Sequence, residues 1–189
     1  MLHKSRCACP GATVWFTGLP SSGKTTVAET VADRLRIESY RVEVLDGDAL
    51  RATLSAGLGF SREDRGASVQ RIGLVAEVLA RNGVITLVSV IAPYADSREA
   101  VKRRHEAAGT AYLEVHVATP LEVCSVRDVK GLYARHRTGQ LTGLTGVDDP
   151  YEVPVAPDLR LETQDVDVAE SAARVYTLLT ARGVVRSRC

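Results

Sequence analysis

The amino-acid sequence predicts an α/β fold of three layers, in which helices cover both faces of a mainly parallel sheet. Two observations predict it. Short apolar runs typical of strands alternate with longer segments whose apolar residues recur at helical spacing. The strand runs also lack polar alternation, as strands do when both faces of a parallel sheet are covered. With 189 residues, 45% of them hydrophobic, the chain is long enough to bury the core of one domain.

The predicted elements alternate regularly along the chain. Five short runs are expected to be strands, at 13–17, 41–45, 84–91, 112–117 and 159–161. Four longer segments are expected to be helices, at 25–35, 62–81, 96–108 and 168–182. Alternation of this kind favours parallel strands joined by helical crossovers.

Local signals support these elements in turn. The first helix follows a glycine-rich loop and has an apolar stripe at Val27, Val31 and Leu35. The second strand stops at Asp46-Gly47-Asp48, where the chain becomes polar. The helix at 62–81 has the clearest apolar face, and Asn82-Gly83 ends it as a C-cap does.

The second half of the chain contains the least regular segment. The strand at 84–91 is halted by Pro93, and a charged helix and another strand follow. Residues 128–157 are rich in Gly, Pro, Arg and Asp and show no sustained period, which is typical of a functional lid. We expect residues 1–11 to be a disordered leader that ends at Pro10-Gly11, and 12–189 to be a single domain.

Composition excludes several classes of function. Lys and Arg number 24 against 23 Asp and Glu, so the net charge is +1, and a nucleic-acid or membrane-surface protein would need a basic excess. No apolar run is long enough to span a bilayer, and no secretory signal is present. We therefore expect a cytoplasmic protein whose four cysteines (Cys7, Cys9, Cys124 and Cys189) are reduced. Cys7 and Cys9 resemble half a metal site, but no second Cys/His pair follows them.

The glycine-rich loop carries the strongest functional signal. It reads Gly18-Leu19-Pro20-Ser21-Ser22-Gly23-Lys24-Thr25-Thr26 and matches the pattern G-x-x-x-x-G-K-[ST] between a predicted strand and a predicted helix. Its glycines let backbone N–H groups surround the phosphates of ATP, Lys24 reaches the β- and γ-phosphates, and Thr25 ligates Mg²⁺. The alternative, a glycine-rich turn beside a capped helix, does not require Lys24. The motif thus predicts a P-loop NTPase fold.

A P-loop alone does not separate kinases from switches and motors. GTPases select guanine with an N-K-x-D element, and the only asparagine of this chain, Asn82, precedes Gly83. A small chain with an irregular lid favours a kinase of a small molecule, because a lid excludes water as a competing phosphoryl acceptor.

The acceptor side is predicted from polar residues after the second strand. Asp46 and Asp48 lie where open α/β sheets bind ligands, so one can serve Mg²⁺ and the other can orient or deprotonate an acceptor hydroxyl. The alternative use of Asp48 is as the N-cap of the next helix. Arg51 and Arg65 can face the same crevice and bind an anion, although surface arginines are often merely solvated.

Read together, these residues resemble the adenylylsulfate kinase family. The resemblance runs from about residue 13 to 179. It includes the P-loop, the stretch 45–51, the Gly57-Leu58-Gly59-Phe60-Ser61 run, the Lys130-Gly131-Leu132-Tyr133 run, and Asp148-Asp149-Pro150-Tyr151-Glu152. The family uses ATP to phosphorylate the 3′-hydroxyl of adenosine 5′-phosphosulfate (APS), which gives PAPS, the activated sulfate donor.

The resemblance implies a role for each matching residue. Asp46 and Asp48 would serve Mg²⁺ and the 3′-hydroxyl, and Arg51 and Arg65 would bind the phosphosulfate end. Phe60 and the Ile91 backbone would contact the acceptor nucleotide. Lys130 and the lid would close over both substrates, with Arg127 against the ATP adenine. The resemblance also implies a homodimer, and any partnership with ATP sulfurylase is expected to be between separate proteins.

Four positions depart from the family's pattern, all on the acceptor side. Ala49 and Ser68 stand where the family commonly has Asn, and Leu144 replaces the Phe that covers the acceptor base opposite Phe60. Ala92 replaces a serine described as phosphorylated, so direct in-line transfer is expected. These departures leave two alternatives open: a sister kinase that phosphorylates another nucleotide or small alcohol, and a nucleotide-binding module without catalysis.

Overall fold

A computed structural model describes residues 11–186 of the chain. The strands are β1 (Ala12–Thr17), β2 (Val42–Asp46), β3 (Ile85–Ser89), β4 (Ala111–Val117) and β5 (Leu159–Leu161). The α-helices are α1 (Lys24–Ile37), α2 (Arg62–Arg81), α3 (Ala95–Ala107), α4 (Leu121–Arg127), α5 (Leu132–Arg137) and α6 (Val168–Ala181), and a short 3₁₀ helix, η1 (Ala49–Ala52), follows β2. Of the expected leader only Gly11 is described, so Cys7 and Cys9 lie outside the described residues, as does Cys189.

All five strands are parallel and form one sheet in the order β2-β3-β1-β4-β5. β1 lies at the centre, where Val14 is opposite Leu87 of β3 on one side and Leu113 of β4 on the other. After β1 the chain continues to β2, and after β4 it continues to β5. The loops that follow these two neighbouring strands therefore leave toward opposite edges of the sheet. This arrangement opens a crevice at the carboxyl ends of the central strands, where open α/β sheets bind ligands.

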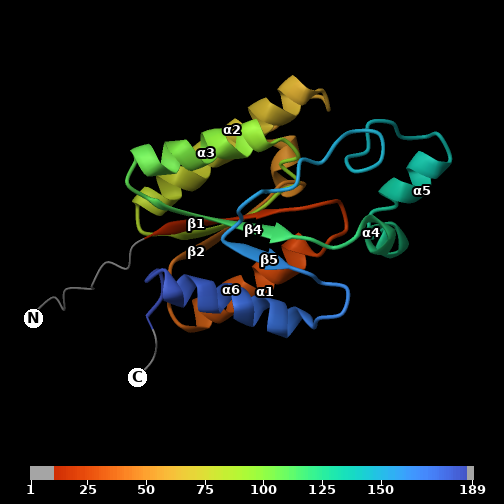
Figure 1. The fold of residues 1–189 in the computed structure, drawn as a ribbon. Helices are drawn as coiled ribbons and strands as arrows, with labels where there is room; N and C mark the ends of the chain where they lie inside the picture. The colour runs from red at the N-terminus through yellow and green to blue at the C-terminus, as the bar shows by residue number, and fades with distance from the viewer. Residues whose placement is uncertain (1–10, 187–189) are drawn as a thin grey trace, which may run out of the picture.

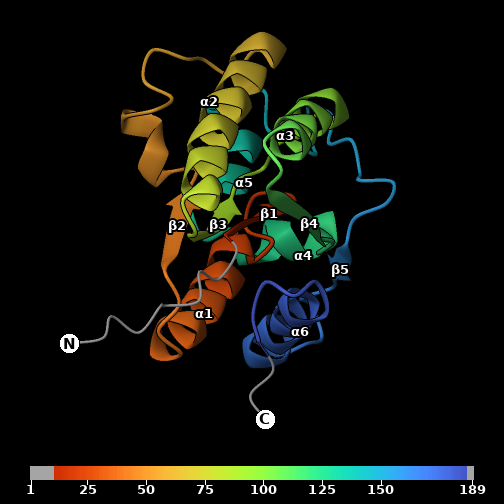
Figure 2. The same cartoon turned by 90° about the vertical axis from the view of Figure 1, so that its left-hand side faces the viewer.

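Helices cover both faces of the sheet, which confirms the predicted three layers (Figures 1 and 2). α1 and α6 pack on one face, and α2 and α3 pack on the other. β1 is fully buried and contributes side chains to the hydrophobic cores on both faces of the sheet. Val14 and Phe16 belong to the cluster with α1 and α6, while Trp15 belongs to the cluster with α2 and α3. β1 lacks polar alternation for this reason.

The lid segment at 128–157 is more ordered than the sequence predicted. It contains the helix α5, and α4 directly precedes it; neither helix was expected. The carboxylate of Asp128 links the two helices, because it accepts hydrogen bonds from the backbone N–H groups of Tyr133 (3.0 Å) and Ala134 (2.8 Å). Beneath this region Cys124, Tyr133 and Leu144 form a third, small buried cluster.

No helix within residues 11–186 is both long enough and apolar enough to cross a membrane.

Candidate active site

The P-loop connects β1 to α1 and has the backbone of an anion-binding nest. Ser21 and Gly23 adopt left-handed φ angles of 60° and 96°, so peptide groups on either side point in alternating directions. Nests of this kind gather N–H groups around an anion, and the N-terminus of α1 adds its partial positive charge. Ser22 is fully buried, and its carbonyl accepts hydrogen bonds from the Thr119 and Thr163 hydroxyls (both 2.9 Å). The residues that follow β4 and β5 therefore hold the loop by hydrogen bonds.

Lys24 lies nearly buried beneath this loop. Its ammonium group donates to the carbonyl oxygens of Gly18 (3.0 Å) and Leu19 (2.7 Å) and to the hydroxyl of Ser22 (3.3 Å). Burial lowers the pKa of Lys24 from 10.5 to about 7, since the site holds no carboxylate in direct contact. The site is thus electrostatically incomplete and suited to an anionic ligand.

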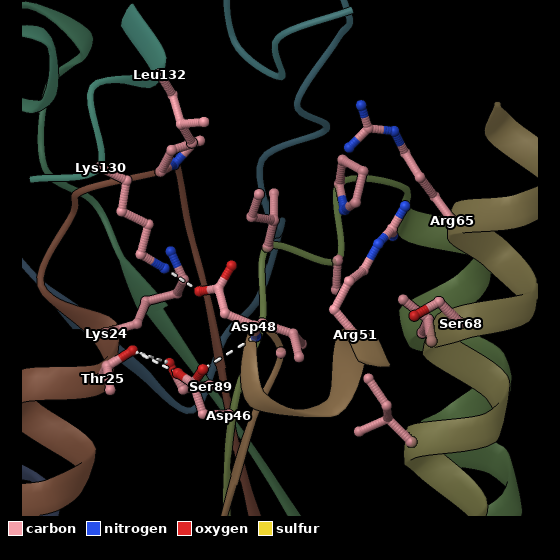
Figure 3. Close-up of a pocket in the computed structure, with 18 of the residues that line it drawn as sticks. Lys24, Thr25, Asp46, Asp48, Arg51, Arg65, Ser68, Ser89, Lys130 and Leu132 are labelled. Carbon is pink, nitrogen blue, oxygen red and sulfur yellow. Dashed lines mark hydrogen bonds and ion pairs between the residues drawn. The ribbon is translucent and has the colours of Figure 1, made fainter. Parts of the chain in front are cut away.

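A cluster of oxygen atoms lies where β2 and β3 end beside the start of α1 (Figure 3). The Thr25 hydroxyl donates to the carboxylate of Asp46 (2.8 Å) and lies 3.0 Å from the Ser89 hydroxyl. The backbone N–H groups of Asp48 (3.0 Å) and Ala49 (3.2 Å) bind the other oxygen of Asp46 and fix its orientation.

These donors fit Mg²⁺. The ion prefers hard oxygen ligands and is usually held by one or two protein side chains together with substrate phosphates. Thr25 and Asp46 supply such a pair beside the P-loop. Across residues 11–186 no group of three or more His, Cys, Asp or Glu side chains could hold a metal by itself. A metal here would accordingly depend on the nucleotide.

Asp48 faces the lid. Its carboxylate forms an ion pair with Lys130, which precedes α5 (Figure 3). Asp48 does occupy the N-cap position of η1, but its side chain makes no capping hydrogen bond there. The pair joins the loop after β2 to the lid across the crevice.

A pocket on this side of the crevice contains most of the predicted acceptor residues. It is lined by residues from the P-loop, η1, α2, the segment after β3 and the lid, among them Asp48, Arg51, Phe60, Arg65, Ser68, Ile91 and Lys130. Arg51 and Arg65, which were expected to face one crevice, both line this pocket (Figure 3). We call this the acceptor pocket.

Phe60 lies beside both arginines and is 60% exposed. The guanidinium carbon of Arg51 is 4.2 Å from the centre of its ring and that of Arg65 is 5.4 Å away. Arg51 donates to the carbonyls of Leu58 and Gly59 (both 3.0 Å). Arg65 binds the lid, where it contacts the Thr145 hydroxyl (3.0 Å) and the Asp149 carboxylate (3.0 Å).

Ser68 and Leu144 differ in their relation to this pocket. Ser68 lines it, and its hydroxyl is 2.6 Å from that of Ser55. Leu144 is 5% exposed, packs with Cys124 and Tyr133, and is not among the residues that line the acceptor pocket. The geometry gives no support to Leu144 as a cover for the acceptor base, because burial holds the side chain inside the lid.

A second pocket, which we call the donor pocket, opens on the other side of the P-loop. It is lined by Gly23, Thr26 and Val27 of the loop and α1, and by Arg127, Thr163, Val166 and Val168. Arg127 donates to the hydroxyl (2.9 Å) and the carbonyl (2.6 Å) of Thr163 and is held at the pocket edge. The two pockets meet at four shared residues: Ser21, Lys24, Thr25 and Lys130.

Two residues of this site were missed from sequence. Ser89 joins the Thr25–Asp46 cluster, and Thr163 holds both the P-loop carbonyl and Arg127. Ser89 had a partial signal, because it lies near the end of the strand predicted at 84–91, and the carboxyl ends of parallel strands share one edge of the sheet. Thr163 had none, because its partners lie 36 and 141 positions away.

Comparisons with known proteins agree on one family. The model of a family described as adenylylsulphate kinase matches residues 10–162. An adenylyl-sulfate kinase of Picosynechococcus is 47% identical over 93% of this chain and 97% of its own. A probable adenylyl-sulfate kinase of Synechocystis is 50% identical over 89% and 93%.

A solved structure gives the same result. The Mycobacterium tuberculosis APS kinase CysC in complex with AMPPNP and APS matches with a TM-score of 0.87 and 46% identity, over 90% of this chain and 98% of that one. The sequence matches and the structural match each cover most of the chain. This chain therefore belongs to the adenylylsulfate kinase family.

Proposed function

We propose that this protein transfers the γ-phosphoryl group of ATP to the 3′-hydroxyl of APS and so produces PAPS. One observation carries the proposal: the donor and acceptor pockets meet at the P-loop lysine and the lid lysine, Lys24 and Lys130. Phosphoryl transfer needs two substrates in line on either side of such a junction. The high identity to named adenylyl-sulfate kinases supports the choice of APS as acceptor.

The donor side positions the phosphates of ATP. Backbone N–H groups of the P-loop surround them, and Lys24 neutralises charge on the β- and γ-phosphates. Thr25 and Asp46 would hold Mg²⁺, which would supply further positive charge to the phosphoryl oxygens. Arg127, held by Thr163, lies against the adenine at the rim of the donor pocket.

The acceptor side positions the attacking hydroxyl. Asp48 accepts the proton of the 3′-hydroxyl, and Lys130 binds the Asp48 carboxylate from the lid until the substrates separate the pair. Arg51 and Arg65 bind the phosphosulfate end, because a guanidinium fork donates two parallel hydrogen bonds to such an anion. Phe60 stacks on the adenine. Ala92 has no hydroxyl, so transfer is direct and needs no phosphoserine.

An assay of ADP release tests the proposal. ATP is supplied with APS and, in parallel, with other nucleotides and small alcohols as acceptors. Turnover with APS supports the proposal; activity with another acceptor and none with APS would identify a sister kinase. ATP binding without any turnover would identify a non-catalytic module. Lys24→Ala is expected to abolish transfer, and a near wild-type rate in that variant would disprove our placement of the phosphate site.

We also propose that the protein works in the cytoplasm as a homodimer, on APS that a separate ATP sulfurylase supplies. Family resemblance supports this. A structural relative from Thiobacillus denitrificans, of whose chain this protein covers 30%, is a hexameric APS kinase. Light scattering of the purified protein distinguishes a dimer from a monomer or a hexamer.

A further inference from the structure

One wall of the acceptor pocket has an unfavourable backbone conformation. Ile91, Ala92 and Pro93 connect β3 to α3, and all three line the acceptor pocket. Ala92 is 3% exposed and has a left-handed φ of 43°, which residues with a Cβ atom rarely adopt. A conformation of this kind persists only where the surroundings hold it.

A chain of two hydroxyl groups binds the carbonyl of Ile91. The Thr17 hydroxyl, at the end of β1, donates to the Ile91 carbonyl oxygen at 2.5 Å. The same hydroxyl lies 3.0 Å from the hydroxyl of Tyr151, which belongs to the lid. Because Thr17 has one hydroxyl proton and gives it to Ile91, Tyr151 is the donor in the second bond. Burial raises the pKa of Tyr151 to about 12, so its hydroxyl keeps the proton at neutral pH.

A buried arginine binds the next carbonyl. Arg98 of α3 is 3% exposed, and its guanidinium group donates to the carbonyl oxygens of Ala92 (2.7 Å) and Glu152 (2.7 Å). It also pairs with the carboxylate of Glu114 on β4 at 3.0 Å. This charge-assisted set fixes Ala92 at its left-handed position and ties the same point to the lid.

The lid residue after Tyr151 completes the attachment. The backbone N–H of Glu152 donates to the carbonyl of Pro93 (2.8 Å), and its carboxylate accepts from the backbone N–H of Ala95 at the start of α3 (2.7 Å). The ring of His116 on β4 stacks on Tyr151 with centroids 5.8 Å apart. Burial lowers the pKa of His116 to about 4, so this neighbour stays neutral. The end of the lid is thus joined to the pocket wall by side-chain and backbone bonds.

We propose that Tyr151 and Arg98 are positioning residues for the acceptor: together they hold the Ile91–Ala92–Pro93 wall in the shape that receives the acceptor nucleotide. This inference rests on the proposed function. Neither side chain lines the donor or the acceptor pocket, so each acts through the wall that it binds. The wall lines the acceptor pocket and not the donor pocket, so loss of the contact is expected to weaken acceptor binding selectively.

Tyr151→Phe tests the proposal in steady-state kinetics, because it removes one hydroxyl and keeps the ring. We expect the KM for APS to rise about fivefold, the effect of one net hydrogen bond, while kcat and the KM for ATP change less than about twofold. Thr17→Val is expected to give at least the same rise. The double variant should resemble Thr17→Val alone, because the two hydroxyls act in series.

Tyr176→Phe is the matched control. Tyr176 is a buried tyrosine, 9% exposed, and its hydroxyl donates to Glu38 at 2.6 Å between α6 and α1. Its loss removes the same group at a distance from both pockets, so the KM for APS should not change. An unchanged KM for APS in Tyr151→Phe, or an equal rise in Tyr176→Phe, would overturn the proposal.

A second measurement needs no substrate. Hydrogen exchange is compared in the wild type, Tyr151→Phe and Tyr176→Phe at the amide protons of Val90 and Glu152, which donate to the carbonyls of Phe16 (3.2 Å) and Pro93 (2.8 Å) at the two sides of the wall. We expect exchange about fivefold faster in Tyr151→Phe only, since one bond that holds the wall is lost. Equal exchange in the wild type and Tyr151→Phe would overturn the proposal. If the wild type failed to phosphorylate APS, the proposed function would fail, and the exchange comparison would still decide whether Tyr151 holds the wall.

Discussion

At the scale of single residues, Lys24 shows how the protein is prepared for a phosphate. Its ammonium group lies at the meeting point of the two pockets and has two carbonyls and a hydroxyl as hydrogen-bond partners. Burial lowers its pKa to about 7. The phosphates of a bound nucleotide favour the charged form and raise the pKa again. Nucleotide binding and protonation of Lys24 are therefore linked.

This linkage predicts proton uptake when a nucleotide binds above pH 7. In that range the free protein has lost the Lys24 proton and the complex retains it, so affinity should fall as the pH rises, by up to about tenfold per pH unit. Calorimetry of AMPPNP binding in two buffers of different ionisation enthalpy measures the uptake. We expect it to approach one proton well above pH 7 and to disappear below it. Binding without proton uptake would contradict the assignment.

The same shift predicts how folding stability depends on pH. The pKa of Lys24 is lower in the folded state than its ordinary value of 10.5, so between pH 7 and 10.5 the unfolded chain binds more protons. The contribution of Lys24 to the free energy of unfolding therefore rises with pH across this window and is least favourable below it. Lys24→Met should flatten this part of the profile, as measured by urea unfolding at a series of pH values. A wild-type slope in that variant would contradict the pKa shift.

A second side chain, Asp48, is predicted to act in the chemical step. Asp48→Asn keeps the size of the side chain but removes the base, so kcat should fall by roughly 10²–10⁴, the usual contribution of general base catalysis. ATP affinity should change little, because Asp48 lines the acceptor pocket and not the donor pocket. Asp33→Asn, on an exposed carboxylate of α1 that pairs with Arg36, is the control and should leave kcat unchanged. A near wild-type kcat in Asp48→Asn would exclude the role.

Single residues could be predicted from sequence where neighbours in the chain act together. The P-loop is one continuous segment, and Asp46 and Asp48 follow one strand, so spacing alone indicated their chemistry. The family likeness added Phe60 and Lys130. Leu144 shows the limit, since its burial against Cys124 and Tyr133 depends on how the lid folds back onto α4. No local pattern encodes that packing.

At the scale of elements, the first turn of α2 is attached to the lid. Arg65 pairs with Asp149 at 3.0 Å, and the two side chains are 11% and 31% exposed. It also donates to the Gly143 carbonyl at 2.7 Å. Nearby, Arg62 pairs with Asp96 at 2.9 Å, but those side chains are 49% and 65% exposed. The first pair is shielded from solvent and stabilises the lid, whereas the second is of the exposed kind that contributes little.

The contrast predicts different effects of two equivalent substitutions. Asp149→Asn should loosen the lid, speed tryptic cleavage at the exposed Arg135 and Arg137, and raise the KM for APS about fivefold, as expected when a charged hydrogen bond is weakened by about 1 kcal/mol. Asp96→Asn removes an Arg–Asp pair of the same kind and should change neither cleavage nor KM. Limited proteolysis and steady-state kinetics measure both effects. Equal cleavage rates and equal KM values for APS in the two variants would contradict the view that burial makes the Arg65–Asp149 pair stronger than the Arg62–Asp96 pair.

Element prediction succeeded where segments are long and periodic and failed where they are short. α2 was predicted at its observed bounds, because its apolar face extends over the helix and Asn82-Gly83 marks its C-terminal end. α4 and α5 have 7 and 6 residues, too few to establish a helical period. They are stabilised by tertiary contacts such as the hydroxyl of Tyr133 on the Pro20 carbonyl (3.1 Å). Such contacts cannot be read from a local window.

At the scale of the whole molecule, strand order determines where the substrates bind. Alternation of strands and helices predicted a parallel sheet, but not that β1 lies between β3 and β4. Several orders satisfy the same alternation, and the choice depends on packing between segments far apart in sequence. The observed order brings the ends of β1, β2 and β3 together, and with them Thr25, Asp46 and Ser89. The catalytic arrangement is therefore a property of the complete fold.

Because both pockets are formed only in the folded chain, each ligand should stabilise it by mass action. Mg-ADP at about 100 times its Kd should add about 2.7 kcal/mol, which for a domain of this size raises Tm by roughly 5–11 °C. APS added to the Mg-ADP complex should raise Tm further, because its pocket adjoins the occupied one and closure of the lid involves both. AMP should give a smaller rise than APS at equal concentration, since it lacks the sulfate that Arg51 and Arg65 are predicted to bind. Differential scanning fluorimetry measures all three shifts in Tm. An AMP shift equal to that of APS would contradict the assignment of Arg51 and Arg65 to the phosphosulfate end.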